Sequence, residues 1–119
     1  MNLNQGLHRF HVGDRLSEMA IFNGTIYLAG QVASDATQDI RGQTTQVLAM
    51  VDRLLTEAGT DRAHILMCQI FLADMADFAG MNDIWDDWVA PGDAPPRATV
   101  RARSVPTSTI QCTCLGLLR

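Results

Sequence analysis

The first half of the chain begins with a pattern that predicts a β-hairpin. Polar and apolar residues alternate loosely over residues 16–22, and a second β-rich run follows over residues 25–29. Asn23 and Gly24 stand between the two runs, and this pair favours the positive φ angles of a type I′ turn. We therefore predict two antiparallel strands that are joined at Asn23-Gly24.

Two apolar segments with different periods come next. From about residue 37 to residue 58, apolar positions keep the i, i+3, i+4 spacing of one helical stripe, and Gly59 favours a helix end there. Residues 64–73 are apolar at both odd and even positions, which suits a strand that is covered on both faces. The pattern predicts a long helix and then a strand near the centre of a sheet. The helical stripe consists of Ile40, Val47, Leu48, Val51, Leu54, Leu55 and Ala58.

The last third of the chain predicts a second helix and two strands. Asp74 and Asp77 offer capping side chains before a helical segment that ends at Pro91-Gly92. We expect its two tryptophans to pack in the core rather than to form a cage around a ligand. Residues 97–105 and 109–118 then have the composition of strands, with a turn around 106–108. The helical stripe consists of Phe78, Met81, Trp85 and Trp88.

Together these elements predict one α+β domain over residues 1–119. The order is β-β-α-β-α-β-β, a mixed sheet with two helices on one face. A length of 119 residues, of which 47% are apolar, suits a single compact core. No apolar run approaches the length that crosses a bilayer, and the first ten residues lack the apolar core of a signal peptide. We expect a cytoplasmic protein with no membrane partner.

Charge and composition exclude several kinds of chemistry. A formal charge of −4 and a pI near 5.1 disfavour nonspecific binding to nucleic acid, which requires clustered cations. All nine cationic residues are arginine, so a lysine Schiff base, including attachment of pyridoxal phosphate, is impossible. The sequence has neither of the glycine-rich loops that bind nucleotide phosphates. We predict chemistry without a cofactor.

The cysteines and histidines predict neither a disulfide nor a metal site. The chain has three cysteines without paired spacing and no predicted export signal. Cys112 and Cys114 share one face of a predicted strand, with Cα atoms roughly 6.6 Å apart, too far for a good bridge. We expect reduced thiols. His8 and His11 lie near the start and His64 lies elsewhere, with no converging third ligand, so we predict no metal.

The strand predicted from residue 97 carries an unusual row of arginines. Arg97 follows Pro95 and Pro96, which hold the backbone extended and stiff. We expect the small apolar side chains of the strand to pack on the helices, so the arginine face must meet water, another subunit or an anion. A guanidinium matches a carboxylate through two parallel hydrogen bonds, which favours a small carboxylate-bearing metabolite; pairing with carboxylates of the protein itself is the alternative. Arg97, Thr99, Arg101 and Arg103 form one face, and Ala98, Val100 and Ala102 form the other.

Three segments carry a distinctive combination of motifs: LAGQVASD (28–35), IFLADMADFAGMNDIWDDWV (70–89) and APPRATVRA (94–102). Their order and spacing resemble the Rid/YjgF family, also called endoribonuclease L-PSP, over roughly residues 16–119. The resemblance implies a chorismate-mutase-like fold and a homotrimer with a ligand cleft at each subunit interface. For the active branch it implies an imine deaminase, a hydrolase that converts reactive enamines and imines of amino acids to 2-keto acids and ammonia. The ribonuclease label finds no catalytic histidine pair or basic groove here.

The resemblance also assigns roles to single residues. Arg97 matches the arginine that grips the substrate carboxylate, and Gly30 matches a glycine whose backbone lines the cleft. Thr99 stands where the best-known members have a cysteine, and Leu16 where many have an aromatic residue with a hydroxyl. Cys112 replaces a glutamate thought to position the attacking water. A neutral thiol is a much weaker hydrogen-bond partner than a carboxylate.

Two functions therefore stay open. As a deaminase, the protein would hold the substrate carboxylate on Arg97, and positioning alone would assist attack by water on an imine that is already electrophilic. Cys112 would be a weak partner for the water, or a nucleophile if Arg97 lowered its pKa. As a binding module, the same cleft would hold keto or amino acids without turnover. Residue 112 is the feature that separates the two.

Overall fold

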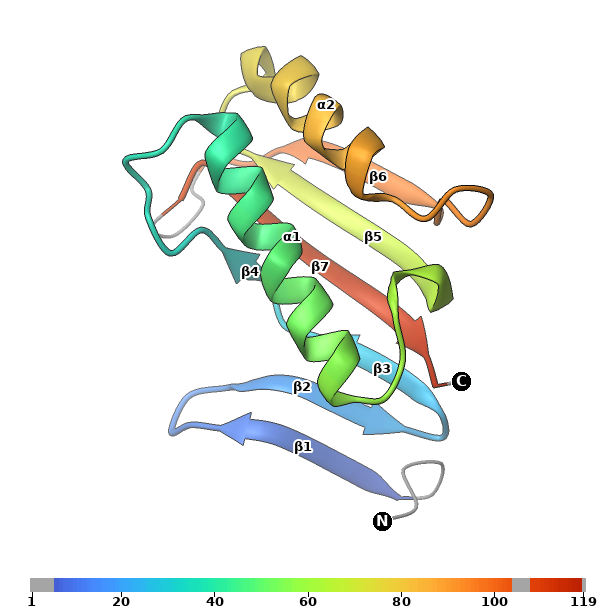
Figure 1. Cartoon of the computed structure of the whole chain (residues 1–119). Coiled ribbons are helices and arrows are strands. Elements are labelled where there is room, and N and C mark those ends of the chain that lie inside the picture. Colours follow the sequence, from blue (N-terminus) through green and yellow to red (C-terminus); the bar gives the residue numbers. More distant parts are fainter. Residues whose placement is uncertain (1–5, 104–107, 119) are drawn as a thin grey trace.

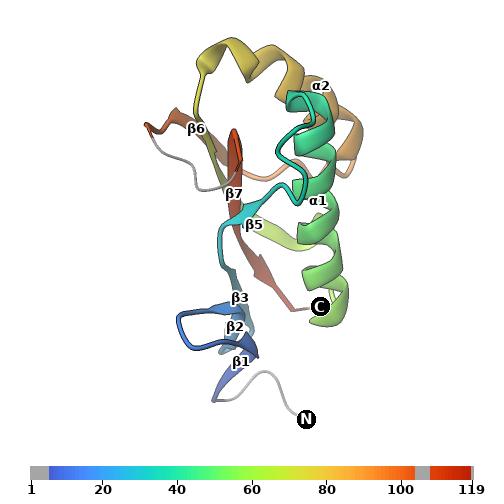
Figure 2. The same ribbon diagram turned by 90° about the vertical axis from the view of Figure 1, so that its left-hand side faces the viewer.

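The computed structural model of the chain describes residues 6–103 and 108–118 and has one layer of helices on one layer of sheet. Both helices, α1 (Ile40–Glu57) and α2 (Phe78–Trp88), lie side by side on the same face of the sheet (Figures 1 and 2). This confirms the predicted α+β architecture. No helix within the described ranges is long and apolar enough to pass through a bilayer. The strands are β1 (Leu7–Val12), β2 (Ser17–Phe22), β3 (Thr25–Leu28), β4 (Gln31–Val32), β5 (Ile65–Leu72), β6 (Arg97–Arg101) and β7 (Ile110–Leu117).

The last strand of the chain lies in the middle of the sheet. The spatial order is β1-β2-β3-β7-β5-β6, and the short β4 also pairs with β7. Within the described ranges, only β5 and β6 run parallel; the other strand pairs are antiparallel. Strands β6 and β7, which are neighbours in sequence, are thus separated by β5. The predicted strand over 97–105 ends at Arg101, and most of the predicted turn at 106–108 lies outside the described residues.

The predicted hairpin is present as β2 and β3. Asn23 and Gly24 have φ angles of 52° and 78°, as a type I′ turn requires. Strands β1 and β4 were not predicted. In β1 the residue His11 has a φ angle of 56°, and such an irregularity interrupts the alternation by which a strand is found in a sequence.

Both ends of α1 have the caps that its sequence favours. The Asp39 side chain accepts a hydrogen bond from the Gly42 N–H at 2.8 Å, so the helix begins at Ile40 rather than near residue 37. At the other end Gly59 has a φ angle of 87° and donates to the Thr56 carbonyl at 3.0 Å, which confirms the predicted end.

The core lies between the helices and one face of the sheet. Because side chains alternate along a strand, every second residue of β5 and β7 points under the helices and the rest point away. The helix-facing set is buried, whereas the opposite face, which we call the open face, is uncovered within the chain. The prediction that residues 64–73 are covered on both faces is therefore not met in the single chain. The buried set comprises Cys68, Ile70, Leu72, Ile110, Cys112 and Cys114; large open-face residues include Tyr27, Met67, Val100 and Leu117.

A titratable contact ties strand β1 to the end of α1. His11 Nε2 lies 2.8 Å from a carboxylate oxygen of Glu57. This hydrogen bond, together with the negative charge of Glu57, raises the pKa of His11 above its ordinary 6.5. Because the folded-state pKa is raised, the contact stabilises the fold fully below pH 6.5, and its contribution disappears as the pH rises through the folded-state value.

We expect Glu57→Gln to return the pKa of His11 toward its ordinary value. An NMR titration of the His11 ring protons measures it directly. The same variant should lose its stability difference from the wild type at high pH, since His11 is then neutral in both. An unchanged His11 titration would contradict the contact.

Candidate functional site

Arg97 stands at the beginning of β6, where the backbone is tied to the neighbouring strand. The Pro96 carbonyl accepts a hydrogen bond from the Cys68 N–H at 2.9 Å, and Arg97 is then aligned with Cys68 in the parallel register. Proline also fixes its own φ angle. The backbone that leads into Arg97 is thus restrained by the proline ring and by the hydrogen bond to β5, which agrees with the stiffness expected from the two prolines.

The side chain of Arg97 points toward the helices, which corrects our prediction. The guanidinium carbon lies 5.0 Å from the ring centre of Trp85 and 6.0 Å from that of Phe78, both on α2. We expected the small apolar residues to face the helices, but Val100 lies on the open face and is about half exposed. The register explains the difference, because Arg97 is aligned with a strand residue that is buried beneath the helices. Aromatic faces attract a guanidinium, so this side of β6 tolerates the charge.

The two tryptophans of α2 pack against the protein, as predicted. Trp85 is buried in the core, and its ring also supports Arg97. The Trp88 indole N–H donates to Asp52 at 2.9 Å, and Arg62 lies over its ring at 5.0 Å. The sequence placed both rings on one helical stripe but gave no sign that one of them underlies an arginine.

Arg97 is half-buried and has no acidic partner among the residues that the structure describes. The ion pairs in this part of the chain are His11–Glu57, Arg41–Asp83, Arg62–Asp52 and His64–Asp61. On the same face, the Thr99 hydroxyl oxygen is buried without a hydrogen-bond partner. A guanidinium without an acidic partner and a hydroxyl without a hydrogen-bond partner, both on one face of one strand, can together hold an anion with acceptor oxygens.

Cys112 lies on the same face of the sheet, two strands away. Ile70 is aligned with Thr99 on one side and with Cys112 on the other. The Cys112 side chain is fully buried, and this burial raises its pKa to about 12, although the nearby positive charge of Arg97 acts in the opposite direction. The thiol is therefore neutral at neutral pH. A thiolate nucleophile at Cys112 is not supported.

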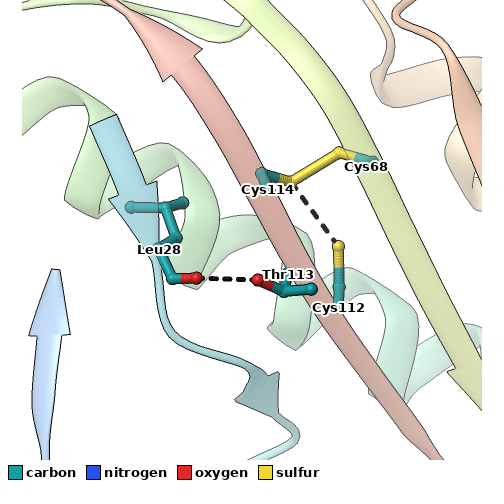
Figure 3. Close-up of a disulfide and its surroundings, with 5 residues drawn as sticks. All are labelled: Leu28, Cys68, Cys112, Thr113 and Cys114. Atoms are coloured by element: carbon teal, nitrogen blue, oxygen red, sulfur yellow. Dashed lines mark hydrogen bonds between the residues drawn. A yellow bond between two sulfur atoms is a disulfide. The ribbon is translucent and has the colours of Figure 1, made fainter. Parts of the chain in front are cut away.

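The remaining cysteines form a disulfide, which corrects the prediction of reduced thiols. Cys68 on β5 and Cys114 on β7 are bonded, with Cα atoms 4.4 Å apart and a χ3 angle of 89° (Figure 3). Both dimensions lie within the usual range for a disulfide. Cys112 remains a free thiol and does not bridge to Cys114, as the strand spacing predicted. The partner was missed because no sequence pattern shows that β5 and β7 are neighbours in this register.

Gly30 and Leu16 do not join Arg97 within the chain. Gly30 precedes β4, and a side chain there would collide with Gln111, whose own side chain lies on the open face. Leu16 is exposed between β1 and β2, four strands from β6, which corresponds to roughly 19 Å at the usual strand spacing. One chain therefore gathers Arg97, Thr99 and Cys112 on its helix-facing side and leaves Gly30 and Leu16 elsewhere.

Comparisons with known proteins agree with one another. Residues 7–111 match the protein family described as endoribonuclease L-PSP. A RutC family protein from Haemophilus ducreyi is 50% identical over 95 residues, which cover 80% of this chain and 81% of that protein. Among crystal structures, an uncharacterized protein from Pseudomonas aeruginosa has a TM-score of 0.92 at 39% identity and covers 96% of this chain and 100% of its own. A YjgF family member from Neisseria meningitidis has a TM-score of 0.91 at 40% identity, with 96% of each chain covered.

Proposed function

The chain belongs to the Rid/YjgF family, also called endoribonuclease L-PSP, and on this premise we propose that it hydrolyses reactive imines of amino acids. The substrate class is 2-imino acids and the enamines in equilibrium with them. Water adds to the carbon of the C=N bond, the nitrogen leaves as ammonia, and a 2-keto acid remains. The reaction needs no cofactor, and a net charge of −4 disfavours nonspecific binding to nucleic acid.

One observation carries the proposal: Arg97 is held in place without an acidic partner in the described part of the chain. The carboxylate of a 2-imino acid would accept two parallel hydrogen bonds from the guanidinium. The rings of Trp85 and Phe78 lie against the Arg97 guanidinium and restrict its motion, which reduces the conformational entropy that Arg97 loses when a ligand binds. The buried Thr99 hydroxyl stands two residues further along the same face as a further donor or acceptor.

The arrangement favours catalysis by positioning. Cys112 cannot remove a proton from water at neutral pH, because burial raises the pKa of its thiol to about 12. An imine is already electrophilic, so a substrate held by its carboxylate gains from a fixed orientation toward water. We infer a modest rate, with Cys112 as a weak hydrogen-bond partner for the attacking water rather than its base.

We further propose that the cleft is completed by a second copy in a homotrimer. Leu16 and Gly30 lie away from Arg97 in the same chain, so they can line its cleft only from a neighbouring subunit. The open face supports assembly, since it exposes large apolar residues and a hollow of about 250 Å³ that Met67, Gln69 and Leu115 help to line. Light scattering in solution should give three times the chain mass; a monomer would refute this part.

A second candidate is carboxylate binding without turnover. The observation that favours it is the neutral, buried thiol of Cys112, which cannot act as a base at neutral pH. In that case the protein would bind 2-keto or amino acids and release them unchanged.

An ammonia-release assay separates the two candidates. Imines are generated in place from several amino acids by an amino-acid oxidase, and ammonia formation is followed with and without the protein. The deaminase predicts faster release that Arg97→Ala removes. Binding of 2-keto acids in calorimetry, with release at the uncatalysed rate for every imine, would support the binding module instead.

A further inference from the structure

The three cysteine sulfurs of the chain lie together beneath the helices. Cys68, Cys112 and Cys114 all project from the helix-facing side of β5 and β7, and their Sγ atoms lie within 4.8 Å of one another. All three residues are buried to 1% exposure or less. Figure 3 shows the sulfur of Cys112 directed toward that of Cys114, at 3.8 Å. The proposed hydrolysis requires neither Cys68 nor Cys114.

The spacing of these sulfurs suits a single bound ion. A thiolate sulfur lies about 2.3 Å from a metal such as zinc, and at that bond length three sulfurs lie about 4.0 Å apart around an ion in their plane and about 3.5 Å apart around a pyramidal ion. Cys112 and Cys114 already have a separation within this range. Cys68 and Cys114 are bonded to each other, and reduction would free them. Because neighbouring strands lie about 4.8 Å apart, the two thiols can separate to the required distance without displacing the strands.

Burial and donor number indicate which ion fits. Three thiolates in the core would carry three negative charges, and uncompensated buried charge is very costly. The one cation near the cluster on the described part of the chain is Arg97, which acts on Cys112. No histidine, aspartate or glutamate of the described residues joins the three sulfurs, so a four-coordinate zinc site is not formed. A trivalent, three-coordinate, thiophilic ion makes a neutral complex.

We propose that the reduced protein binds one trivalent arsenic ion through Cys68, Cys112 and Cys114. A phosphine first reduces the disulfide: it takes the oxygen of one water, becomes a phosphine oxide, and leaves two thiols. Arsenite, As(OH)₃, then exchanges its three hydroxyl groups for three thiols. Three As–S bonds form, three As–O bonds break, and each hydroxyl leaves with one thiol proton as water. Soft sulfur ligands select soft ions, which is the basis of the preference.

Native mass spectrometry of the phosphine-reduced full chain with arsenite tests the site. The expected mass gain is one arsenic atom less three hydrogens. Arsenite should also raise the unfolding temperature of the reduced protein, because the ion binds the folded site in preference to the unfolded chain. Oxidised protein is the matched control and should show no gain, since it offers one thiol. Cys112→Ser should weaken binding on the order of 100-fold, because one of three linked donors is lost.

Three outcomes would overturn the proposal. The first is no mass gain with reduced wild type. The second is equal arsenite affinity in Cys112→Ser, which would mean that two sulfurs suffice. The third is arsenite binding with an unchanged or lowered unfolding temperature, which would mean that the ion does not bind the folded protein in preference to the unfolded chain. Cys112→Ser keeps the Cys68–Cys114 pair, so its melting curve in the oxidised form shows whether the variant itself folds.

Discussion

Replacing Arg97 by alanine is expected to abolish binding of small carboxylates. The substitution removes a cation that is held between the β6 backbone and the rings of Phe78 and Trp85. Loss of one partner of a hydrogen-bonded charge pair costs about 2 to 5 kcal/mol, or a factor of at least about 30 in Kd. Isothermal calorimetry with a 2-keto acid such as pyruvate measures the change. If the protein is a deaminase, ammonia release should fall with it.

Arg101→Ala is the matched control for this variant. Arg101 lies on the same face of the same strand as Arg97 and is exposed. Its replacement by alanine removes the same charge from the chain. It should leave affinity unchanged within about twofold, because an exposed charge contributes little. Arg97→Lys should recover only part of the affinity, since an ammonium lacks the planar pair of donors. Equal affinities of Arg97→Ala and wild type would refute both the deaminase and the binding module, since both depend on this guanidinium.

Local patterns predicted most of the fold. The hairpin at Asn23-Gly24, the helix that ends before Gly59 and the strand at residues 65–72 all follow from turn chemistry and periodicity, although only one face of that strand is covered within the chain. Pairing between distant strands did not follow. Insertion of β7 between β3 and β5 depends on contacts across the chain, and no short-range signal encodes it. The two strands that were missed are a two-residue strand and one with an irregular residue, both too weak for a pattern.

The same limit explains what was missed around Arg97. The strand pattern grouped Arg97 with Thr99 correctly, but it could not say which face of β6 meets the helices. That choice is made by the parallel register with β5, which aligns Arg97 with Cys68. Register also decides that Cys68 meets Cys114, and hence that a disulfide forms. The chemical properties of each side chain could be predicted from the sequence, whereas the residues that surround it in the fold could not.

The site as a whole combines a positioned cation with a neutral thiol. Arg97 is supported by aromatic rings and has no acidic partner in the described part of the chain, whereas Cys112 is fully buried and neutral. The cation and the thiol stand on two different strands, β6 and β7. If the protein is a deaminase, loss of Arg97 on β6 should act through substrate binding, whereas the rate of attack by water should depend on residue 112 on β7.

Cys112→Glu is expected to raise the rate of ammonia release from imines at least about 100-fold. A positioned carboxylate can accept a proton from the attacking water, and general base catalysis typically contributes a factor of about 10² to 10⁴. Arg97 already lies close enough to act on residue 112, so the introduced carboxylate has a cation to compensate its burial. Because it also competes for that cation, KM should rise together with kcat. Steady-state ammonia release with the same imines measures both constants.

Cys112→Gln distinguishes the base from a change of size. The amide has the length and shape of the carboxylate but cannot take up the proton, so its kcat should stay near that of the wild type. Melting curves are needed for both variants, since residue 112 is fully buried in the chain and either side chain is larger than the thiol. If the glutamate and glutamine variants release ammonia equally fast, a base at this position is not what limits turnover. The neutral thiol would then have to be explained by binding alone, and the function of Arg97 would be to hold carboxylates rather than to prepare them for hydrolysis.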